Sequence, residues 1–91
     1  HRFVITVDGE IAGVVLYAVT SGTITLRHTE IDDRFAGRGL GGRLVRSALD
    51  EARGRGLTVV PVCPFVRSWI RRHPGYIDLV PMDRRADYEL S

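Results

Sequence analysis

The sequence contains no lysine, asparagine or glutamine, and it has a single cysteine, Cys63. A lone cysteine excludes an internal disulfide and any zinc site that needs several cysteines. No apolar run approaches the roughly 20 residues that a membrane-spanning helix requires, and no signal peptide is recognised at the start. These absences favour a protein of the reducing cytoplasm that does not associate with a membrane.

The composition is typical of one globular domain over residues 1–91. Of these residues, 44% are hydrophobic and 26% are charged, a balance found in ordinary folded proteins. The formal net charge of +2 is too small to indicate nucleic-acid binding by itself. It is compatible with binding of anionic small molecules. No spacing of His, Asp and Glu suggests a metal site. We expect a monomer or a weak homodimer, since an exposed sheet edge would permit self-association.

The first third of the chain is predicted to be an antiparallel meander of three strands. Two segments rich in β-branched residues each end in a pair typical of a tight turn, Asp8-Gly9 and Ser21-Gly22. The third segment, residues 23–31, alternates along its length. This alternation predicts a common face for Ile24, Leu26, His28 and Glu30.

Beyond the meander, the pattern predicts a helix, a strand and a second helix. Apolar residues at helical spacing indicate a helix over 40–53, and the apolar run 57–63 indicates a buried strand. Pro64 opens a second helix that ends before Pro74, and segment 76–91 has no clear assignment. A strand–helix–strand unit makes a right-handed crossover, so the last strand should pair in parallel. The predicted fold class is α/β: a small mixed sheet, antiparallel apart from one parallel strand, with helices packed on it.

Glycines crowd the segment between the third strand and the first helix. A Walker A loop is excluded because Arg43-Leu44 stands where a lysine and a hydroxyl residue are required. The dinucleotide fingerprint G-x-G-x-x-G does match Gly37, Gly39 and Gly42. However, hairpin-type strands precede it, and no acidic residue follows at the ribose-binding position.

A third interpretation fits the strand–loop–helix context better. The free backbone N–H groups of residues 37–42 and the positive helix end would bind a pyrophosphate, with Arg38 at the rim. The alternative is that the glycines only make a tight turn.

Three segments in this order resemble the short GCN5-related N-acetyltransferases, in particular their minimal YjdJ-like branch: HTEI, GRGLGGRLV and VVPVCPFVRSWIRRHP. The resemblance extends from about Phe3 to Leu79. The family's coenzyme A loop follows the pattern Q/R-x-x-G-x-G/A, whose first position falls either on Ala36 or, two residues earlier, on Arg34. In either register the resemblance implies that the pyrophosphate lies on one run of backbone: Gly37, Arg38, Gly39, Leu40, Gly41 and Gly42.

The resemblance implies an acetyl-CoA-dependent N-acetyltransferase whose acceptor is a small amine or a peptide or protein amine. The strands on either side of the first helix would splay apart, and the pantetheine arm would pair with backbone near Thr29 and Ile31. A coenzyme A-binding module without efficient turnover is the alternative. A nucleic-acid or protein interaction domain is a second rival.

The chemistry of amine acetylation selects a few candidate catalytic residues. Larger family members often carry a tyrosine that protonates the leaving thiolate, and Ile70 takes the corresponding place here. Cys63 is the candidate substitute, as a proton donor or as a nucleophile, although a buried bystander is the plain alternative. His28 and Glu30 are the candidates for the base that takes a proton from the amine.

The second helix supplies the remaining candidates. Arg67 and Arg71 lie four residues apart on one face, and Arg67 is the candidate ligand of the 3′-phosphate of the coenzyme. Phe65 and Trp69 share another face, and we expect them in the core rather than at the acceptor.

Overall fold

The chain begins as three antiparallel strands because two tight turns reverse its direction. In the computed structural model, which describes residues 1–90, the strands are β1 (Arg2–Val7), β2 (Glu10–Thr20) and β3 (Thr23–Ile31). The turn residues have positive φ, at 51° and 81° for Asp8 and Gly9 and at 50° and 78° for Ser21 and Gly22. This left-handed backbone matches the twist of the strands that it joins. The predicted meander is confirmed.

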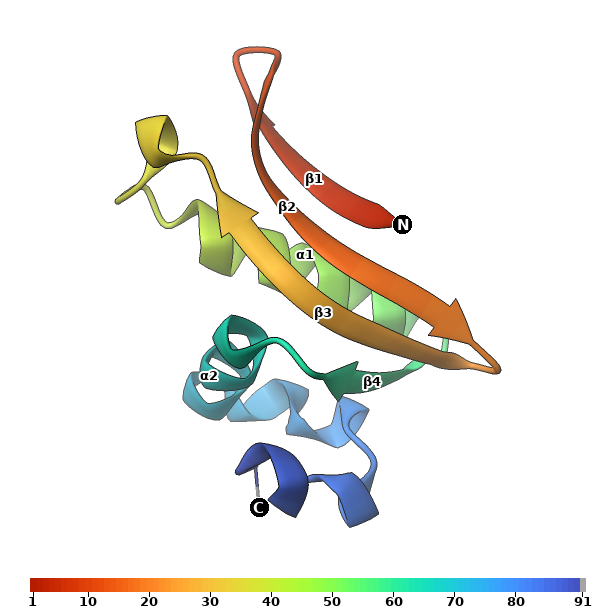
Figure 1. Cartoon of the computed structure of the whole chain (residues 1–91). Helices are drawn as coiled ribbons and strands as arrows, with labels where there is room; N and C mark the ends of the chain where they lie inside the picture. Colours follow the sequence, from red (N-terminus) through yellow and green to blue (C-terminus); the bar gives the residue numbers. More distant parts are fainter. Residues whose placement is uncertain (91) are drawn as a thin grey trace.

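A parallel strand completes the sheet. Helix α1 (Leu40–Gly54) follows β3, lies behind the sheet in Figure 1 and returns the chain to β4 (Thr58–Pro61). β4 pairs in parallel with β3, which gives the strand order β1-β2-β3-β4. Helix α2 (Pro64–Arg72) follows β4 and packs beside the first turn of α1. The predicted α/β class, a mixed sheet with helices packed on it, is therefore confirmed.

A β-bulge interrupts β3 near its middle. Leu16 of β2 pairs with His28, whereas the next residue of β2, Tyr17, pairs with Leu26. Arg27 is therefore an extra residue on β3, and the side chains beyond it exchange faces of the sheet.

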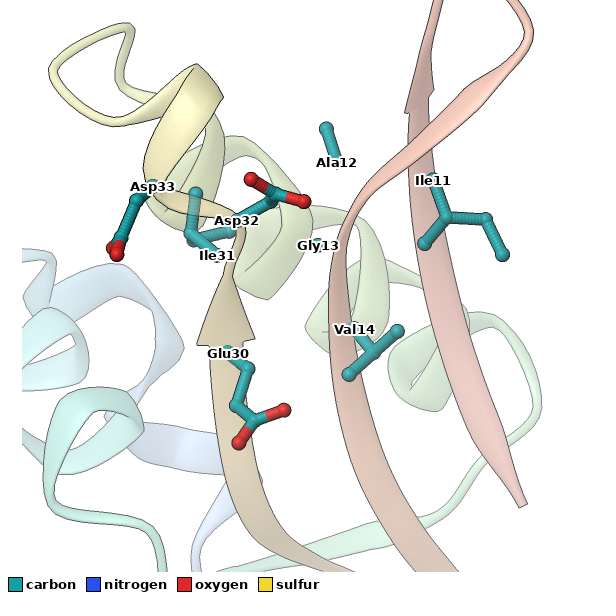
Figure 2. A pocket seen from close by; sticks show the side chains of 8 residues that line it. All are labelled: Ile11, Ala12, Gly13, Val14, Glu30, Ile31, Asp32 and Asp33. Atoms are coloured by element: carbon teal, nitrogen blue, oxygen red, sulfur yellow. The ribbon is translucent and has the colours of Figure 1, made fainter.

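The bulge overturns one prediction about the face of β3. Leu26 is buried before the bulge, but beyond it Thr29 and Ile31 are the partly buried residues, while His28 and Glu30 are exposed. His28 and Glu30 thus do not share a face with Leu26, as the sequence alternation predicted, but lie on the outer face of the sheet. Figure 2 shows Glu30 and Ile31 at this end of β3.

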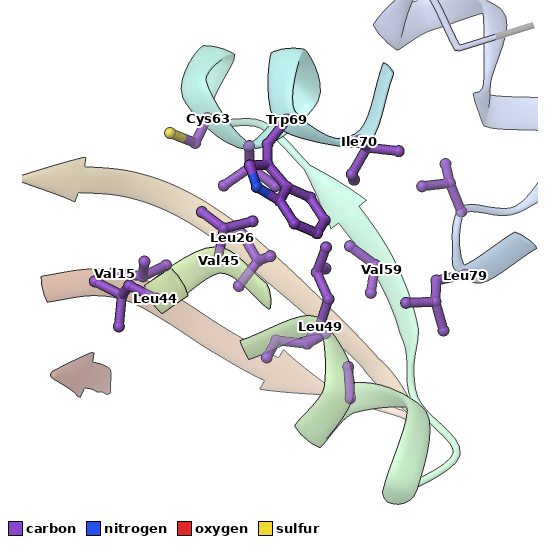
Figure 3. Close-up of a cluster of buried hydrophobic side chains, with 14 of the residues drawn as sticks. Val15, Leu26, Leu44, Val45, Leu49, Val59, Cys63, Trp69, Ile70 and Leu79 are labelled. Atoms are coloured by element: carbon purple, nitrogen blue, oxygen red, sulfur yellow. The ribbon is translucent and has the colours of Figure 1, made fainter. Parts of the chain in front are cut away.

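The core lies between the inner face of the sheet and the helices. Apolar side chains from strands β2, β3 and β4 and from both helices fill it (Figure 3), among them Val15, Leu26, Val59, Leu44, Val45, Leu49, Trp69 and Ile70. Burying these groups is the main favourable term in folding. Trp69 is buried as predicted, but Phe65 is 41% exposed and does not belong to the core.

The C-terminal segment, which the sequence left unassigned, forms short 3-10 turns: η2 (Pro74–Leu79), η3 (Met82–Arg84) and η4 (Ala86–Tyr88). Buried Val80 and Leu90 attach this segment to the core. Arg53 of α1 forms a two-pronged ion pair with Asp78, with N–O distances of 2.8 and 3.0 Å. These hydrogen bonds hold the pKa of the Asp78 carboxyl below its usual value. Among residues 1–90, no helix is both long and apolar enough to cross a membrane.

Candidate active site

Strands β3 and β4 separate at the C-terminal end of β4. Pro61 has no N–H to donate to β3. The N–H of Val62 donates within its own segment, to the C=O of Val60 at 3.1 Å, and not to β3. The last backbone hydrogen bond between the two segments runs from the N–H of Cys63 to the C=O of Leu26, at 3.0 Å. β3 continues to Ile31, beyond the point where β4 ends. The backbone of its final residues therefore has no strand partner on this side and borders an opening.

The backbone of β3 presents polar groups to this opening. Asp32, just beyond the strand, donates its N–H to the C=O of Ala12 at 2.8 Å, so its backbone faces β2. Since successive residues of an antiparallel strand alternate, Glu30 also faces β2, whereas Thr29 and Ile31 direct their N–H and C=O groups into the opening. These are the positions that the resemblance assigns to the pantetheine arm, and the bulge is what turns them there.

The glycine segment forms a loop at the N-terminal end of α1. Gly37 and Gly39 have φ values of 80° and 72°, and Gly39 is the N-cap of the helix with no side-chain cap. The first turn contains no acidic residue, and the first N–H with a partner belongs to Arg43, which donates to Gly39 at 3.2 Å. Within residues 1–90, no backbone N–H of residues 37–42 has an acceptor. Free donors and an unscreened positive helix end make this loop suitable for an anion.

A cavity of about 430 Å³ lies between this loop and α2. Phe65, Trp69, Arg72 and His73 line it opposite the glycines. The two walls approach closely only because Gly41 and Gly42 lack a Cβ, which would lie 2.7 Å from the Phe65 ring and 3.2 Å from Trp69, respectively. The glycines therefore serve the turn and the helix packing, while their amides stay free.

Cys63 lies at the point where the opening meets α2. It is the N-cap residue of α2, which agrees with the predicted strand-to-helix junction, and it is only 3% exposed. Its Sγ lies 3.4 Å from Oγ1 of Thr29, across the gap between the two strands. The structure thus brings together a thiol, a hydroxyl and the free backbone groups of β3.

Comparison with known proteins identifies the family of this chain. Residues 2–79 match the sequence profile of the GCN5-related N-acetyl-transferase family. The chain belongs to this family. It is also similar to Protein NATD1 of Xenopus tropicalis, with 32% identity over 62 residues. That match covers 67% of this chain and 57% of the relative, so the chain spans little more than half the length of this relative.

The structure places the other two catalytic candidates of this N-acetyl-transferase domain on the outer face of the sheet. His28 and Glu30 form a pair there, with Nε2 and Oε1 3.1 Å apart and both side chains largely exposed. Glu30 also lines a shallow hollow of about 520 Å³ (Figure 2), together with Asp32 and Asp33. Ile31 lines both this hollow and the cavity at the glycine loop.

Arg34 holds the loop that follows β3. Its guanidinium contacts Asp32 and, at 3.2 Å, Glu10. The hydrogen bonds from Arg34 lower the pKa of the Asp32 carboxyl. Buried Phe35 anchors the same loop, and the guanidinium of Arg38 lies 5.3 Å from its ring centre. The side chain of Arg38 does not line the cavity at the glycine loop, so its place at the rim of a pyrophosphate site stays a prediction.

Arg67 lies away from the cavity at the glycine loop. Its guanidinium bonds the C=O of Val62 at 3.2 Å and lies 5.7 Å from the ring centre of Tyr88, on a different side of α2 from the cavity. Arg72 lines the cavity instead. Sequence reasoning missed Arg72 because helical spacing gives the relative faces of α2 but not which face meets α1. Among residues 1–90, no three His, Cys, Asp or Glu side chains gather as a metal site would require.

Proposed function

We propose that this domain binds acetyl-CoA in the cavity between the glycine loop and α2 and transfers the acetyl group to an amine. One observation carries the proposal: the N–H groups of residues 37–42 have no acceptor in the described chain, at the start of a helix whose first turn has no acid. A pyrophosphate supplies the acceptors and the negative charge that such a loop favours. Family membership supports the same ligand.

The geometry suggests a path for the rest of the coenzyme. From the glycine loop, the pantetheine arm would run along Thr29 and Ile31. Its amides would pair with their backbone groups and so take the place of the missing strand. The thioester would then lie near Cys63. Acetyl-CoA supplies an activated acyl group in this arrangement, and the protein supplies position and proton transfer.

The side chains divide the proton transfers between two faces of the sheet. The core and the helices fill the inner face, so the amine would approach from the outer face. His28 and Glu30 are exposed there, and either would take the proton of the amine. The amine nitrogen forms a bond to the acyl carbon as the carbon–sulfur bond breaks, and the departing thiolate needs a proton. Cys63 would donate that proton, or its thiolate would first accept the acetyl group and pass it to the amine.

A coenzyme A-binding module without efficient turnover is the second candidate. Ile70, which takes the place of the usual tyrosine, is completely buried in the core and has no proton to give. If Cys63 is inert, no residue that lines the cavity at the glycine loop carries a thiol or a phenol, and binding would occur without useful catalysis.

Calorimetric titration of acetyl-CoA, followed by mass spectrometry and an amine screen, separates these candidates. We expect saturable binding to the wild type and to Cys63→Ala, with acetylated amine formed by the wild type and strongly reduced by the substitution. An acetyl adduct on the wild type that is absent from Cys63→Ala would identify the acyl-enzyme route. Binding with no acetylation of any amine would favour the binding module.

A charge reversal tests the loop itself. Arg38→Glu places a carboxylate beside the free amides and should weaken acetyl-CoA binding about tenfold or more. Arg55→Glu makes the same charge change at the other end of α1, where Arg55 is the C-cap residue. Equal affinities for the two variants would contradict binding at the loop.

A further inference from the structure

The cavity beside the glycine loop has an uneven distribution of charge. No acidic side chain lines it, and one guanidinium does, that of Arg72 at the end of α2. This guanidinium makes only a long contact of 3.5 Å with Oγ of Ser68, and no carboxylate of residues 1–90 lies within ion-pair distance of it. His73, its neighbour, is fixed: its Nδ1 donates to the C=O of Trp69 at 2.8 Å and its ring stacks on Trp69 at 3.9 Å. Arg72 is therefore the cation of this wall that remains available to a ligand.

Helix α2 runs from the reactive end of the site to this cation. Cys63 caps its start, Phe65 abuts Gly41, Trp69 abuts Gly42, and Arg72 ends it. At about 1.5 Å per residue, the helix separates the backbone of Cys63 from that of Arg72 by roughly 13 Å. The glycine loop lies between these two ends.

We propose that Arg72 binds the ribose 3′-phosphate of the coenzyme and thereby selects coenzyme A over dephospho-CoA. This inference rests on the proposed function. With the thioester at Cys63 and the pyrophosphate on the glycine loop, the remaining phosphate lies beyond the loop, toward the end of α2. A guanidinium offers two parallel donors to a phosphate, a geometry that a point charge does not reproduce.

The helical phase explains why Arg72 has this role and its neighbours do not. Phe65, Trp69 and Arg72 follow one another at spacings of four and three residues, so they form one stripe toward the cavity. Arg67 lies off this stripe, on Val62 and Tyr88. Arg71 is also off the stripe, 3.9 Å from Glu89.

Binding of coenzyme A and of 3′-dephospho-CoA to the wild type, Arg72→Ala and Arg71→Ala tests the proposal by calorimetry. We expect the wild type to bind coenzyme A about tenfold more tightly than dephospho-CoA, because a charge-assisted contact to phosphate is worth about that factor. Arg72→Ala should lose this preference by weakening coenzyme A alone. Arg71→Ala removes the same charge from the adjacent residue and should behave as the wild type.

One further variant and the comparison of the two ligands make the outcome decisive. Arg72→Lys keeps the charge without the forked donors and should retain only part of the preference. A loss that is equal for both ligands would overturn the assignment to the 3′-phosphate and place Arg72 at the pyrophosphate. An unchanged preference in Arg72→Ala would overturn it as well. If the wild type binds neither ligand, the proposed function itself fails, which the wild-type titrations reveal before any variant is compared.

Discussion

At the scale of single residues, the contact between Thr29 and Cys63 is the feature closest to the proposed chemistry. The hydroxyl and the thiol lie 3.4 Å apart, at a point where the backbones of their two segments no longer pair. The sequence located Cys63 at the strand-to-helix junction, because an apolar run ends there and Pro64 marks a helix start. It did not pair Cys63 with Thr29, since the bulge that turns Thr29 inward has no signature in the local sequence.

Replacing Thr29 tests whether this contact orients the thiol. We expect Thr29→Val to lower the rate of acetyl transfer by about tenfold, because it removes a hydrogen-bonding group next to Sγ. Thr29→Ser keeps the hydroxyl and should retain most of the rate. Steady-state kinetics of the three proteins, with acetyl-CoA affinity as the control, provides the measurement. Wild-type turnover in Thr29→Val would show that the contact is packing alone.

The ion pair between Arg53 and Asp78 makes a pH-dependent contribution to stability. The guanidinium lowers the pKa of the Asp78 carboxyl in the folded state, so the contribution is present above the ordinary aspartate pKa of about 3.9. It is lost as the pH falls through the lower pKa of the folded protein. Both side chains are substantially exposed, with values of 45% and 61%, so screening by solvent keeps this contribution small.

Arg53→Gln should therefore lower the free energy of unfolding at neutral pH slightly. The part of this difference that comes from Asp78 should vanish in strong acid, whereas the part from the hydrogen bond of Arg53 to the C=O of Gly75, at 3.1 Å, should persist. Urea unfolding at a series of pH values gives both results, and NMR titration of Asp78 should show its pKa rising in the variant. A difference that does not change with pH would show that the ion pair makes no contribution to stability.

At the scale of elements, the strands and helices followed from local patterns, but their exact faces did not. Alternation in residues 23–31 predicted a strand correctly, yet Arg27 adds a residue and moves His28 and Glu30 to the outer face. Similarly, the spacing correctly placed Phe65 and Trp69 on one face of α2. However, Phe65 lies against Gly41 and is 41% exposed, so it is not part of the core. Both differences arise from contacts between elements, which a pattern within one element does not contain.

The turn between β2 and β3 offers a test of local backbone strain away from the site. Ser21 adopts a φ of 50°, which costs energy for most side chains, whereas asparagine tolerates it. Ser21→Asn should raise the free energy of unfolding by about 0.5 kcal/mol. Thermal or urea unfolding measures the change, and Ser21→Val, whose branched side chain resists this φ, should shift it the other way. A more stable valine variant would exclude the left-handed turn.

At the scale of the whole molecule, the arrangement leaves one face of the sheet open. A tight turn joins β1 directly to β2, so no helix between them covers the outer face, and Val4, Ile11 and Leu16 are each more than 40% exposed. Helix α1 lies behind the sheet, and α2 and the C-terminal turns lie beside β4 (Figure 1). The cavity at the glycine loop and the His28–Glu30 pair therefore lie on opposite sides of the sheet, and the proposed reaction would join them through the opening between β3 and β4.

The most direct test of this arrangement is the amide NMR spectrum of the ¹⁵N-labelled protein during titration with acetyl-CoA. We expect saturable shifts centred on residues 37–42 and on Thr29 and Ile31, because their N–H groups are free to bind the coenzyme. The turn amide of Gly22, which lies at the other end of β3 from the glycine loop, serves as an internal reference. Saturable shifts at the loop and at β3 would support acetyl-CoA binding in the opening. An unchanged spectrum, or shifts confined to other surfaces, would contradict it.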